Sequence, residues 1–159
     1  MASKILIDTN VLLDYLLTRE PFYEDAKKVI LKCTEGEVKG CIAAHSIPNM
    51  FFILRKDYDA KDRREILCSL CKIFEIEGID NIKERREILL SICEIFDIIG
   101  IDKTKLIIGL ENEDFSDFED CLQMECAKAY GAEYIVTRNV SDYVISEVTA
   151  ILPEDYLKL

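Results

Sequence analysis

Apolar residues along this chain occur in two alternating arrangements: short continuous runs, and longer segments in which they recur at helical spacing. Short apolar runs bounded by polar residues are typical of strands buried on both faces, whereas the helical spacing is typical of amphipathic helices. The pattern predicts strands near residues 4–8, 40–44, 133–137 and 148–152, and it predicts helices near 10–17 and 22–32, from Ser46 onward, and within 114–131.

Individual residues mark the ends of two of these helices. Ser46 is suited to be the N-cap of the helix in HSIPNMFFILRKD, because its hydroxyl can accept a hydrogen bond from a free backbone N–H. Pro48 is tolerated in the first turn, where the backbone N–H has no partner within the helix. Gly131 is suited to close the helix within 114–131, because glycine readily adopts the left-handed conformation of a helix C-terminus.

The alternation of short strands with helices predicts an α/β protein with a three-layer α/β/α architecture, in which a mainly parallel sheet of about five strands carries helices on both faces. No linker rich in serine, glycine or proline divides the chain, and its 159 residues match the size of one domain, so we expect a single domain over residues 1–159. In such sheets, binding sites assemble outside the carboxyl ends of the strands.

The middle of the chain contains a tandem repeat. Residues 63–80, RREILCSLCKIFEIEGID, recur as residues 85–102, RREILLSICEIFDIIGID, with 13 of 18 positions identical. Each copy has helical spacing followed by a short tail typical of a strand. The tail DIIGI of the second copy is nearly continuous in apolar residues, so we expect it to supply a buried strand, and we expect the first copy to supply an exposed or edge strand. Two copies are too few for a solenoid, which indicates a duplication inside one domain.

Seven cysteines, an odd number in a chain with no recognisable export signal, indicate reduced thiols and a cytoplasmic protein. Cys68 and Cys71 form a C-x-x-C motif on the apolar side of a helical pattern, where packing explains them better than redox or zinc chemistry does. His45 is the only histidine, and it could complete a zinc site with these two cysteines only on a fold that the pattern does not support. No apolar run approaches the ~20 residues that cross a bilayer, so we expect no membrane span.

The formal net charge is -11, which weighs against a general nucleic-acid coat protein, because such a protein needs a basic surface. The charge is compatible with an enzyme that acts on nucleic acid through metal ions. Acids gathered in one cleft can hold cations, and those cations can meet the phosphates. The acids at the ends of the predicted elements are therefore the residues of interest.

Oxygen-bearing side chains follow predicted strands or begin predicted helices at four places. Taken singly, each place has a structural explanation as a helix cap, a partner of a helix dipole or a turn. Taken together they indicate one site, because KILIDTN and EYIVTRN both run from an apolar strand directly into oxygen-bearing residues. If those two strands are neighbours, their loops open on one cleft. The candidates are Asp8 and Asn10, Ser46 and Asn49, Asp117 and Asp120, and Thr137, Asn139 and Asp142.

A cleft of this kind favours a hard divalent cation. Several carboxylates within a few ångströms cannot all ionise without a counter-charge, so the cleft either holds protons or binds a cation. Oxygen ligands with little histidine or thiolate nearby suit Mg²⁺ or Mn²⁺ better than zinc. These ions commonly take phosphate oxygens as further ligands, which favours phosphodiester hydrolysis as the reaction.

These motifs resemble those of the PIN-domain family, the metal-dependent ribonucleases that include the VapC-type toxins of bacterial toxin–antitoxin pairs. ILIDTNVLLDYL is similar to the family's first strand and first acid, and DFEDCLQMECAKAYGAEYIVTRNVSDY matches its D-A-L helix and T-R-N-x-x-D-F loop in order and spacing. The resemblance covers nearly the whole chain except one copy of the repeat. It implies that Asp8, Asp120 and Asp142 are catalytic metal ligands, that Asp117 is an accessory ligand, and that Asn10, Ser46, Asn49, Thr137 and Asn139 support the site or the substrate.

The resemblance implies an endoribonuclease dependent on Mg²⁺ or Mn²⁺, with RNA as substrate and with an antitoxin and a second copy of the chain as partners. Where those toxins carry a glutamate at the start of a helix, this chain has Asn49, so we expect weaker or altered metal affinity. A catalytically weak module that binds RNA or a protein is therefore an alternative. A phosphatase with Asp8 as nucleophile is a third reading, disfavoured because Asn10 stands where such enzymes usually have a second acid.

Overall fold

The computed structural model describes residues 2–56 and 82–159. Within these ranges strands and helices alternate along the chain, as the sequence pattern predicts. The strands are β1 (Lys4–Ile7), β2 (Lys39–Ala43), β3 (Asp97–Ile99), β4 (Tyr134–Val136) and β5 (Thr149–Ile151). The helices are α1 (Thr9–Leu16), α2 (Tyr23–Thr34), α3 (Ser46–Lys56), α5 (Ile82–Ile95), α6 (Lys103–Glu111), α7 (Phe118–Tyr130), the 3₁₀ helix η1 (Val140–Tyr143) and α8 (Pro153–Tyr156).

The strands form one parallel sheet in the order β3-β2-β1-β4-β5. β1 lies at its centre, where Leu6 is paired with Cys41 of β2 on one side and with Ile135 of β4 on the other. All residues of β1 after Lys4 are apolar and buried, as a strand covered on both faces requires. The parallel sheet with its central β1 confirms the expected fold class.

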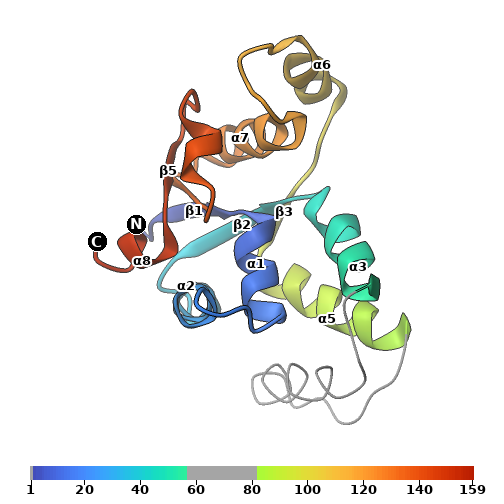
Figure 1. Cartoon of the computed structure of the whole chain (residues 1–159), viewed down its shortest axis with the longest axis vertical. Helices are drawn as coiled ribbons and strands as arrows, with labels where there is room; N and C mark the ends of the chain where they lie inside the picture. Colours follow the sequence, from blue (N-terminus) through green and yellow to red (C-terminus); the bar gives the residue numbers. More distant parts are fainter. Residues whose placement is uncertain (1, 57–81) are drawn as a thin grey trace.

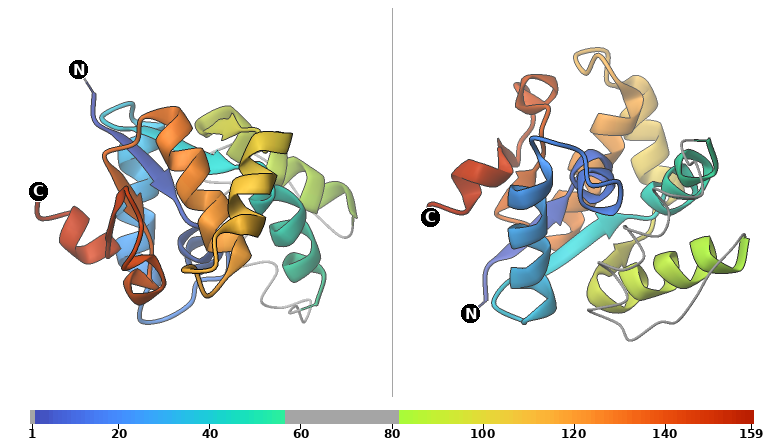
Figure 2. Two further views of the ribbon diagram at one scale, coloured as in Figure 1. Left: turned by 90° about the horizontal axis from the view of Figure 1, so that it is seen from above. Right: turned by 60° about the horizontal axis from the view of Figure 1, so that its bottom comes forward.

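Helices cover both faces of the sheet and complete the three layers (Figures 1 and 2). Successive side chains of a strand point to opposite faces, and Ile5 and Ile7 accordingly belong to one hydrophobic cluster while Leu6 belongs to another. The first cluster includes residues of α1, α2, α3 and α5, and the second includes residues of α7. In Figure 1, α6 lies beyond α7, at the outside of the molecule.

Several predicted helix boundaries need correction. The segment predicted as one helix within 114–131 becomes helical only at Phe118, and its residues before that point form a loop. Gly131 ends α7 with a φ of 73°, which confirms the predicted closing residue. Ser46 is the first residue of α3 rather than the residue before it, so its assignment as N-cap was wrong. The pattern did not predict α6, because the apolar residues of KTKLIIGLE form a run of the kind that strands also have.

The tandem repeat lies partly within the described residues. Its second copy, residues 85–102, supplies most of α5 and all of β3. The expectation that this copy supplies a buried strand was wrong, because β3 lies at the edge of the sheet and both Asp97 and Ile98 are exposed. An apolar tail indicates a strand but does not distinguish a central position from an edge position. The first copy, residues 63–80, lies outside the described residues.

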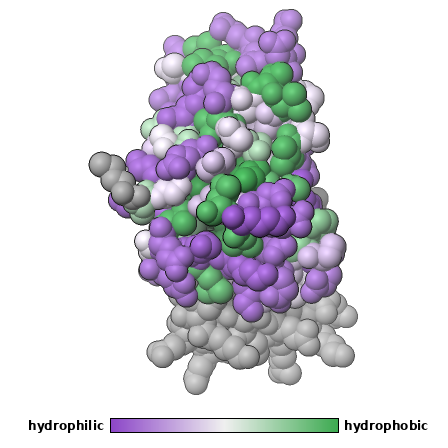
Figure 3. All heavy atoms as spheres, turned by 90° about the vertical axis from the view of Figure 1, so that its left-hand side faces the viewer, coloured by the Kyte–Doolittle hydropathy of each residue, from purple (hydrophilic) through white to green (hydrophobic). Residues whose placement is uncertain are grey.

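Apolar side chains also reach the surface. Figure 3 views the molecule from the side of β5 and α8, where hydrophobic residues form small groups between hydrophilic ones. Within the described ranges, none of the helices has both the length and the apolar character needed to cross a membrane. The cysteines that the structure describes carry free thiols, as expected, whereas Cys68 and Cys71 lie outside the described residues.

Candidate active site

The order of the strands creates a switch point at the carboxyl end of β1. β2 and β3 lie on one side of β1, and β4 and β5 lie on the other. Where neighbouring connections leave a parallel sheet in opposite directions, a crevice opens outside the strand ends, and ligands bind there. Asp8 directly follows β1, Thr137 directly follows β4, and these strands are neighbours. The predicted meeting of the two loops is therefore confirmed.

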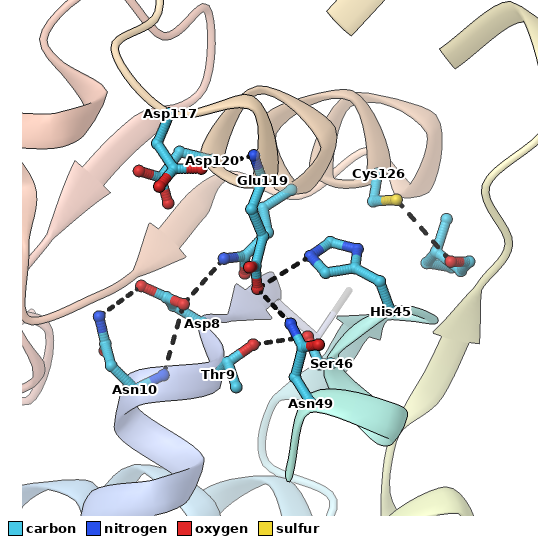
Figure 4. Close-up of polar contacts among 12 residues, drawn as sticks. Asp8, Thr9, Asn10, His45, Ser46, Asn49, Asp117, Glu119, Asp120 and Cys126 are labelled. Atoms are coloured by element: carbon cyan, nitrogen blue, oxygen red, sulfur yellow. Dashed lines mark hydrogen bonds and ion pairs between the residues drawn. The ribbon is translucent and has the colours of Figure 1, made fainter. Parts of the chain in front are cut away.

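Asp8 is almost completely enclosed, with 4% of its surface exposed. Its Oδ2 accepts hydrogen bonds from Nδ2 of Asn10 and from Oγ1 of Thr137, each at 2.6 Å. Its Oδ1 accepts a hydrogen bond from Nε2 of Gln123 on α7 at 2.9 Å. Asp8 is also the N-cap of α1, where its Oδ1 accepts a longer hydrogen bond of 3.4 Å from the backbone N–H of Asn10 (Figure 4). The capping role and a role in the crevice are thus compatible.

Burial raises the pKa of Asp8, and the negative charge of Glu119 acts in the same direction. The hydrogen bonds from Thr137, Gln123 and Asn10 lower it, because they stabilise the ionised form. The donors that surround this carboxylate are all neutral. The oxygens of Asp8 therefore have hydrogen-bond donors, but none of these donors carries a positive charge to balance the carboxylate.

Asp120 lies in the first turn of α7 and accepts a 3.0 Å hydrogen bond from the phenol of Tyr143. The pKa of this carboxyl is raised to about 6, first by burial and then by the negative charges of Asp8, Asp117 and Asp142. The hydrogen bond from Tyr143 opposes the rise. Burial, the negative charges of Asp8, Asp120 and Glu119, and the hydrogen bond to Asp120 raise the pKa of Tyr143, so its phenol stays protonated and remains a donor. The acids predicted from sequence therefore share one electrostatic neighbourhood.

The other candidate residues of this region are more exposed. Asp117 is the N-cap of α7 and accepts a 2.7 Å hydrogen bond from the backbone N–H of Glu119, which is the contact of a helix cap. Asp142 lies half-buried in η1. Asn139 is exposed, and its backbone N–H donates to Oγ1 of Thr137 at 3.0 Å. That contact supports the threonine that holds Asp8.

An ion pair anchors the loop after β4 to α1. Nη1 of Arg138 lies 2.9 Å from Oδ1 of Asp14, which is 1% exposed, and Nη1 of Arg19 lies 3.9 Å from the same oxygen. The guanidinium of Arg138 also lies 4.6 Å from the centre of the Phe22 ring. Burial raises the pKa of Asp14, and the two guanidinium groups oppose this rise. The backbone N–H of Arg138 donates to Oδ1 of Asn10 at 3.3 Å, which connects the ion pair to the residues around the crevice.

The start of α3 faces α7 across the crevice in Figure 4 and makes two kinds of contact. Ser46 is fully buried, and its hydroxyl accepts a 2.7 Å hydrogen bond from that of Thr9, which joins α3 to α1. Nδ2 of Asn49 donates to Oε1 of Glu119 at 2.7 Å, and Nε2 of His45 lies 3.4 Å from the same oxygen, forming an ion pair when the imidazole is protonated. The pKa of Glu119 is lowered, chiefly by His45 and further by Asn49, against the opposing effect of partial burial.

The donor set of this crevice suits a hard divalent cation, because it consists of carboxylate and amide oxygens. Oε1 of Gln123 is buried and has no hydrogen-bond partner among the described residues, although the nitrogen of the same amide is bonded to Asp8. An orphaned acceptor next to a carboxylate is suited to a cation or a water molecule. In residues 2–56 and 82–159, no three His, Cys, Asp or Glu side chains stand close enough to hold one ion. The residues present fit Mg²⁺ or Mn²⁺ by their chemistry.

Sequence reasoning missed three side chains of the crevice: Gln123, Tyr143 and Glu119. Gln123 could have been found, because it lies three residues after Asp120 and four after Glu119, and such spacings share one face of a helix. Tyr143 stands at the last, aromatic position of the T-R-N-x-x-D-F motif, but its contact with Asp120 joins η1 to α7 and so has no signal in local spacing. The contact of Glu119 with α3 depends on how two helices approach each other, which local spacing does not reveal.

The fold and the crevice define a parallel three-layer α/β protein with a carboxylate-lined site at the switch point of its sheet. A family model described as the PIN domain matches residues 4–141. The chain belongs to the PIN-domain family. The match includes both strands whose ends form the crevice, β1 and β4.

Solved structures share this fold at low sequence identity. A chain in the crystal structure of FitAcB from Neisseria gonorrhoeae is 17% identical, with a TM-score of 0.65, over 94% of this chain and 98% of that one. A chain in the structure of FitAB bound to the IR36 DNA fragment is 16% identical, with a TM-score of 0.64, over 94% of each chain. A chain of VapBC2 from Rickettsia felis, bound to a DNA fragment from their promoter, is 13% identical, with a TM-score of 0.56, over 94% of this chain and 98% of that one. No curated protein matches the chain by sequence.

Proposed function

We propose that this protein is a Mg²⁺- or Mn²⁺-dependent endoribonuclease that hydrolyses RNA phosphodiester bonds. The observation that carries the proposal is the pair of aspartates at the switch point, the buried Asp8 and the half-buried Asp120, whose pKa values are both raised. Carboxylates whose ionised forms are disfavoured by burial and by one another are stabilised by a divalent cation. Asp142 is the third proposed ligand and Asp117 the accessory one, since the charges of both act on Asp120.

The residues around the two aspartates orient them for this role. Asn10 and Thr137 hold one oxygen of Asp8, and the phenol of Tyr143 holds Asp120. Because these donors are neutral, they fix the direction of each carboxylate and leave its charge available to a cation. A divalent cation held there would supply Lewis-acid chemistry to phosphodiester hydrolysis.

We further propose that the chain acts as the toxin of a toxin–antitoxin pair, bound by an antitoxin protein and assembled as a homodimer. Support comes from membership of the PIN-domain family and from the fold shared with chains of FitAcB, FitAB and VapBC2. Induced expression in a bacterial host tests the proposal. We expect growth arrest with the wild-type chain and normal growth with Asp8→Asn, and equal growth with both at equal protein levels would contradict it.

Cleavage of a structured RNA by the purified protein tests the nuclease itself. We expect cleavage with Mn²⁺, none in the presence of a chelator, and a loss of at least about tenfold in Asp8→Asn and Asp120→Asn, as is typical when a group that binds or orients a metal is altered. Asp25→Asn is the matched control, because that partly exposed carboxylate lies on α2, away from the crevice, and is paired with Lys28. Cleavage that persists with chelator, or that is unchanged in both site variants, would refute the assignment.

A binding module without turnover is the second candidate. It is favoured by the neutral donors that already satisfy both oxygens of Asp8, and by the amide of Asn49 on α3 in place of an acid. Isothermal calorimetry with Mn²⁺ and with RNA distinguishes the two candidates. Uptake of RNA without any cleavage over a long incubation with Mn²⁺ would favour the module, and multiple turnovers would exclude it.

A further inference from the structure

Glu119 is an acid of the crevice that the sequence motifs do not assign. It belongs to the first turn of α7 but extends away from that helix toward α3 (Figure 4). Oε1 of Glu119 accepts the 2.7 Å hydrogen bond from Nδ2 of Asn49, and Nε2 of His45 lies 3.4 Å from the same oxygen. Asn49 of α3 and His45, which directly precedes α3, thus hold one oxygen of an acid from the opposite layer.

We propose that Glu119 is an additional cation-binding carboxylate of the site, and that Asn49 is the positioning residue that aims it into the crevice. This inference rests on the proposed function, since it concerns the same divalent cation. It also bears on the charge of the site. The negative charge that α3 does not carry at Asn49 is supplied from α7, through a hydrogen bond made by that same asparagine.

The contacts of Glu119 leave it able to take this role. The contacts with His45 and Asn49 both fall on Oε1, and Oε2 has no hydrogen-bond or ion-pair partner among the described residues. The charge of Glu119 also acts at the centre of the crevice, where it contributes to the raised pKa of Asp8 and of Tyr143. The carboxylate is therefore close enough to the other acids to add to their attraction for a cation.

A second observation at the same place points to a ligand. Gln123 lies four residues after Glu119, which is one turn along the same face of α7. Its side chain is 2% exposed, its Nε2 donates to Asp8, and its Oε1 has no hydrogen-bond partner among the described residues. A buried oxygen without a donor is costly unless a cation or water completes it. This face of α7 thus presents an open carboxylate oxygen and an orphaned amide oxygen.

The competing explanation is that Glu119 only ties α7 to α3. The two explanations differ in what Glu119→Gln should do. Glutamine keeps an Oε1 acceptor for Nδ2 of Asn49, so a tie between the helices survives the substitution. The negative charge is lost, which removes a role in cation binding and, where the imidazole is protonated, the ion pair with His45. The measurement that separates them is cation affinity, with the stability of the metal-free protein as the control.

Calorimetric titration with Mn²⁺ on the full chain provides the first part of the test. We expect Glu119→Gln to weaken Mn²⁺ binding by at least about tenfold, the lower end of the range for residues that support a metal site. Its Tm in EDTA should stay within about 3 °C of that of the wild type, because the partly exposed ion pair with His45 contributes at most about 1 kcal/mol. Glu94→Gln removes the same charge from an exposed position on α5 and should bind Mn²⁺ as the wild type does.

Reversing the polarity of the hydrogen bond provides the second part. In Asn49→Glu combined with Glu119→Gln, the amide lies on α7 and the carboxylate on α3, so the same pair can form in the opposite direction. We expect this double variant to recover Mn²⁺ affinity relative to Glu119→Gln alone. Wild-type affinity in Glu119→Gln, or a folded double variant that binds no better than Glu119→Gln, would overturn the inference.

One further comparison separates this inference from the proposed function. If the wild-type chain binds no Mn²⁺, or if Asp120→Asn binds it as tightly as the wild type, then the metal site itself is refuted and the inference falls with it. If Asp120→Asn loses Mn²⁺ binding while Glu119→Gln retains it, the metal site stands and only the role of Glu119 is refuted.

Discussion

Replacing Asp120 with asparagine should stabilise the metal-free protein at neutral pH, even though this aspartate is central to the proposed function. Its pKa is raised from 3.8 to about 6 in the folded chain. An acid with a raised pKa binds its proton more tightly in the folded state, so its stabilising effect is complete below the unfolded pKa and is lost as the pH rises through the folded pKa. The ionised carboxylate therefore destabilises the fold above about pH 6 and not below pH 3.8.

The size of the effect follows from the same pKa. A rise from 3.8 to about 6 corresponds to at most about 3 kcal/mol, at about 1.4 kcal/mol for each pKa unit. Asp120 is half-buried, and solvent screens part of its repulsion from neighbouring acids, so we expect about 1–2 kcal/mol. For a chain of this length that is an increase in Tm of about 3–6 °C. Asparagine keeps an oxygen that can accept the hydrogen bond from Tyr143, so the variant removes charge with little loss of contact.

Thermal unfolding followed by circular dichroism in EDTA measures this effect. The advantage of Asp120→Asn over the wild type should be absent near pH 4 and should grow to its full size by pH 7.5. Adding Mn²⁺ should raise the Tm of the wild type and should not raise that of the variant, because only a ligand that binds the folded state stabilises it. Asp25→Asn controls for the loss of one surface charge. A variant less stable than the wild type at pH 7.5, or an advantage independent of pH, would refute the reasoning.

Three other substitutions test the scaffold around the site. Arg138→Met should lower the free energy of unfolding by about 3 kcal/mol, because it leaves Asp14 buried without its 2.9 Å partner, and adding Asp14→Asn should recover part of the loss in urea unfolding. Gly40→Ala should cost about 1–3 kcal/mol in the same assay, because a Cβ there would lie 2.7 Å from the buried ring of Phe96, and an unchanged midpoint would contradict the packing. Asp142→Asn should change stability by less than about 0.5 kcal/mol and lower RNA cleavage by at least about tenfold, so full cleavage would remove it from the ligand set.

The sheet and the meeting of its loops could be predicted because the signal was local. The segments that contain Asp8 and Thr137 both run from an apolar strand into oxygen-bearing residues, and the two strands are neighbours in the sheet. Edge position has no such signal. β3 has apolar residues typical of a buried strand, yet it pairs with β2 alone in the described sheet and Ile98 is exposed. The spacing of apolar residues indicates whether an element is a helix or a strand more reliably than it indicates whether that element is buried.

The contacts that complete the site were beyond prediction for a different reason. Hydrogen bonds from Gln123 to Asp8 and from Asn49 to Glu119 each join two elements that are far apart in the chain. Residue type limits which groups can donate and which can accept, but many pairings satisfy that limit. Only the approach of α7 to the carboxyl end of the sheet selects one of them. The acids could therefore be named from sequence, and the neutral groups that hold them could not.

The side chains that donate hydrogen bonds to Asp8 are neutral, and this neutrality favours a role in binding a cation. A carboxylate paired with a permanently charged guanidinium or ammonium group already has its counter-charge, and it gains little from a divalent cation. Arg138 directly follows Thr137, the residue that donates a hydrogen bond to Asp8. Its guanidinium nevertheless pairs with Asp14, which lies one turn beyond Asn10 on α1. Asp8 is left with hydrogen bonds from uncharged donors. The positive charge that the loop brings to α1 thus stabilises the scaffold, and the negative charge at the switch point is left for a cation to neutralise.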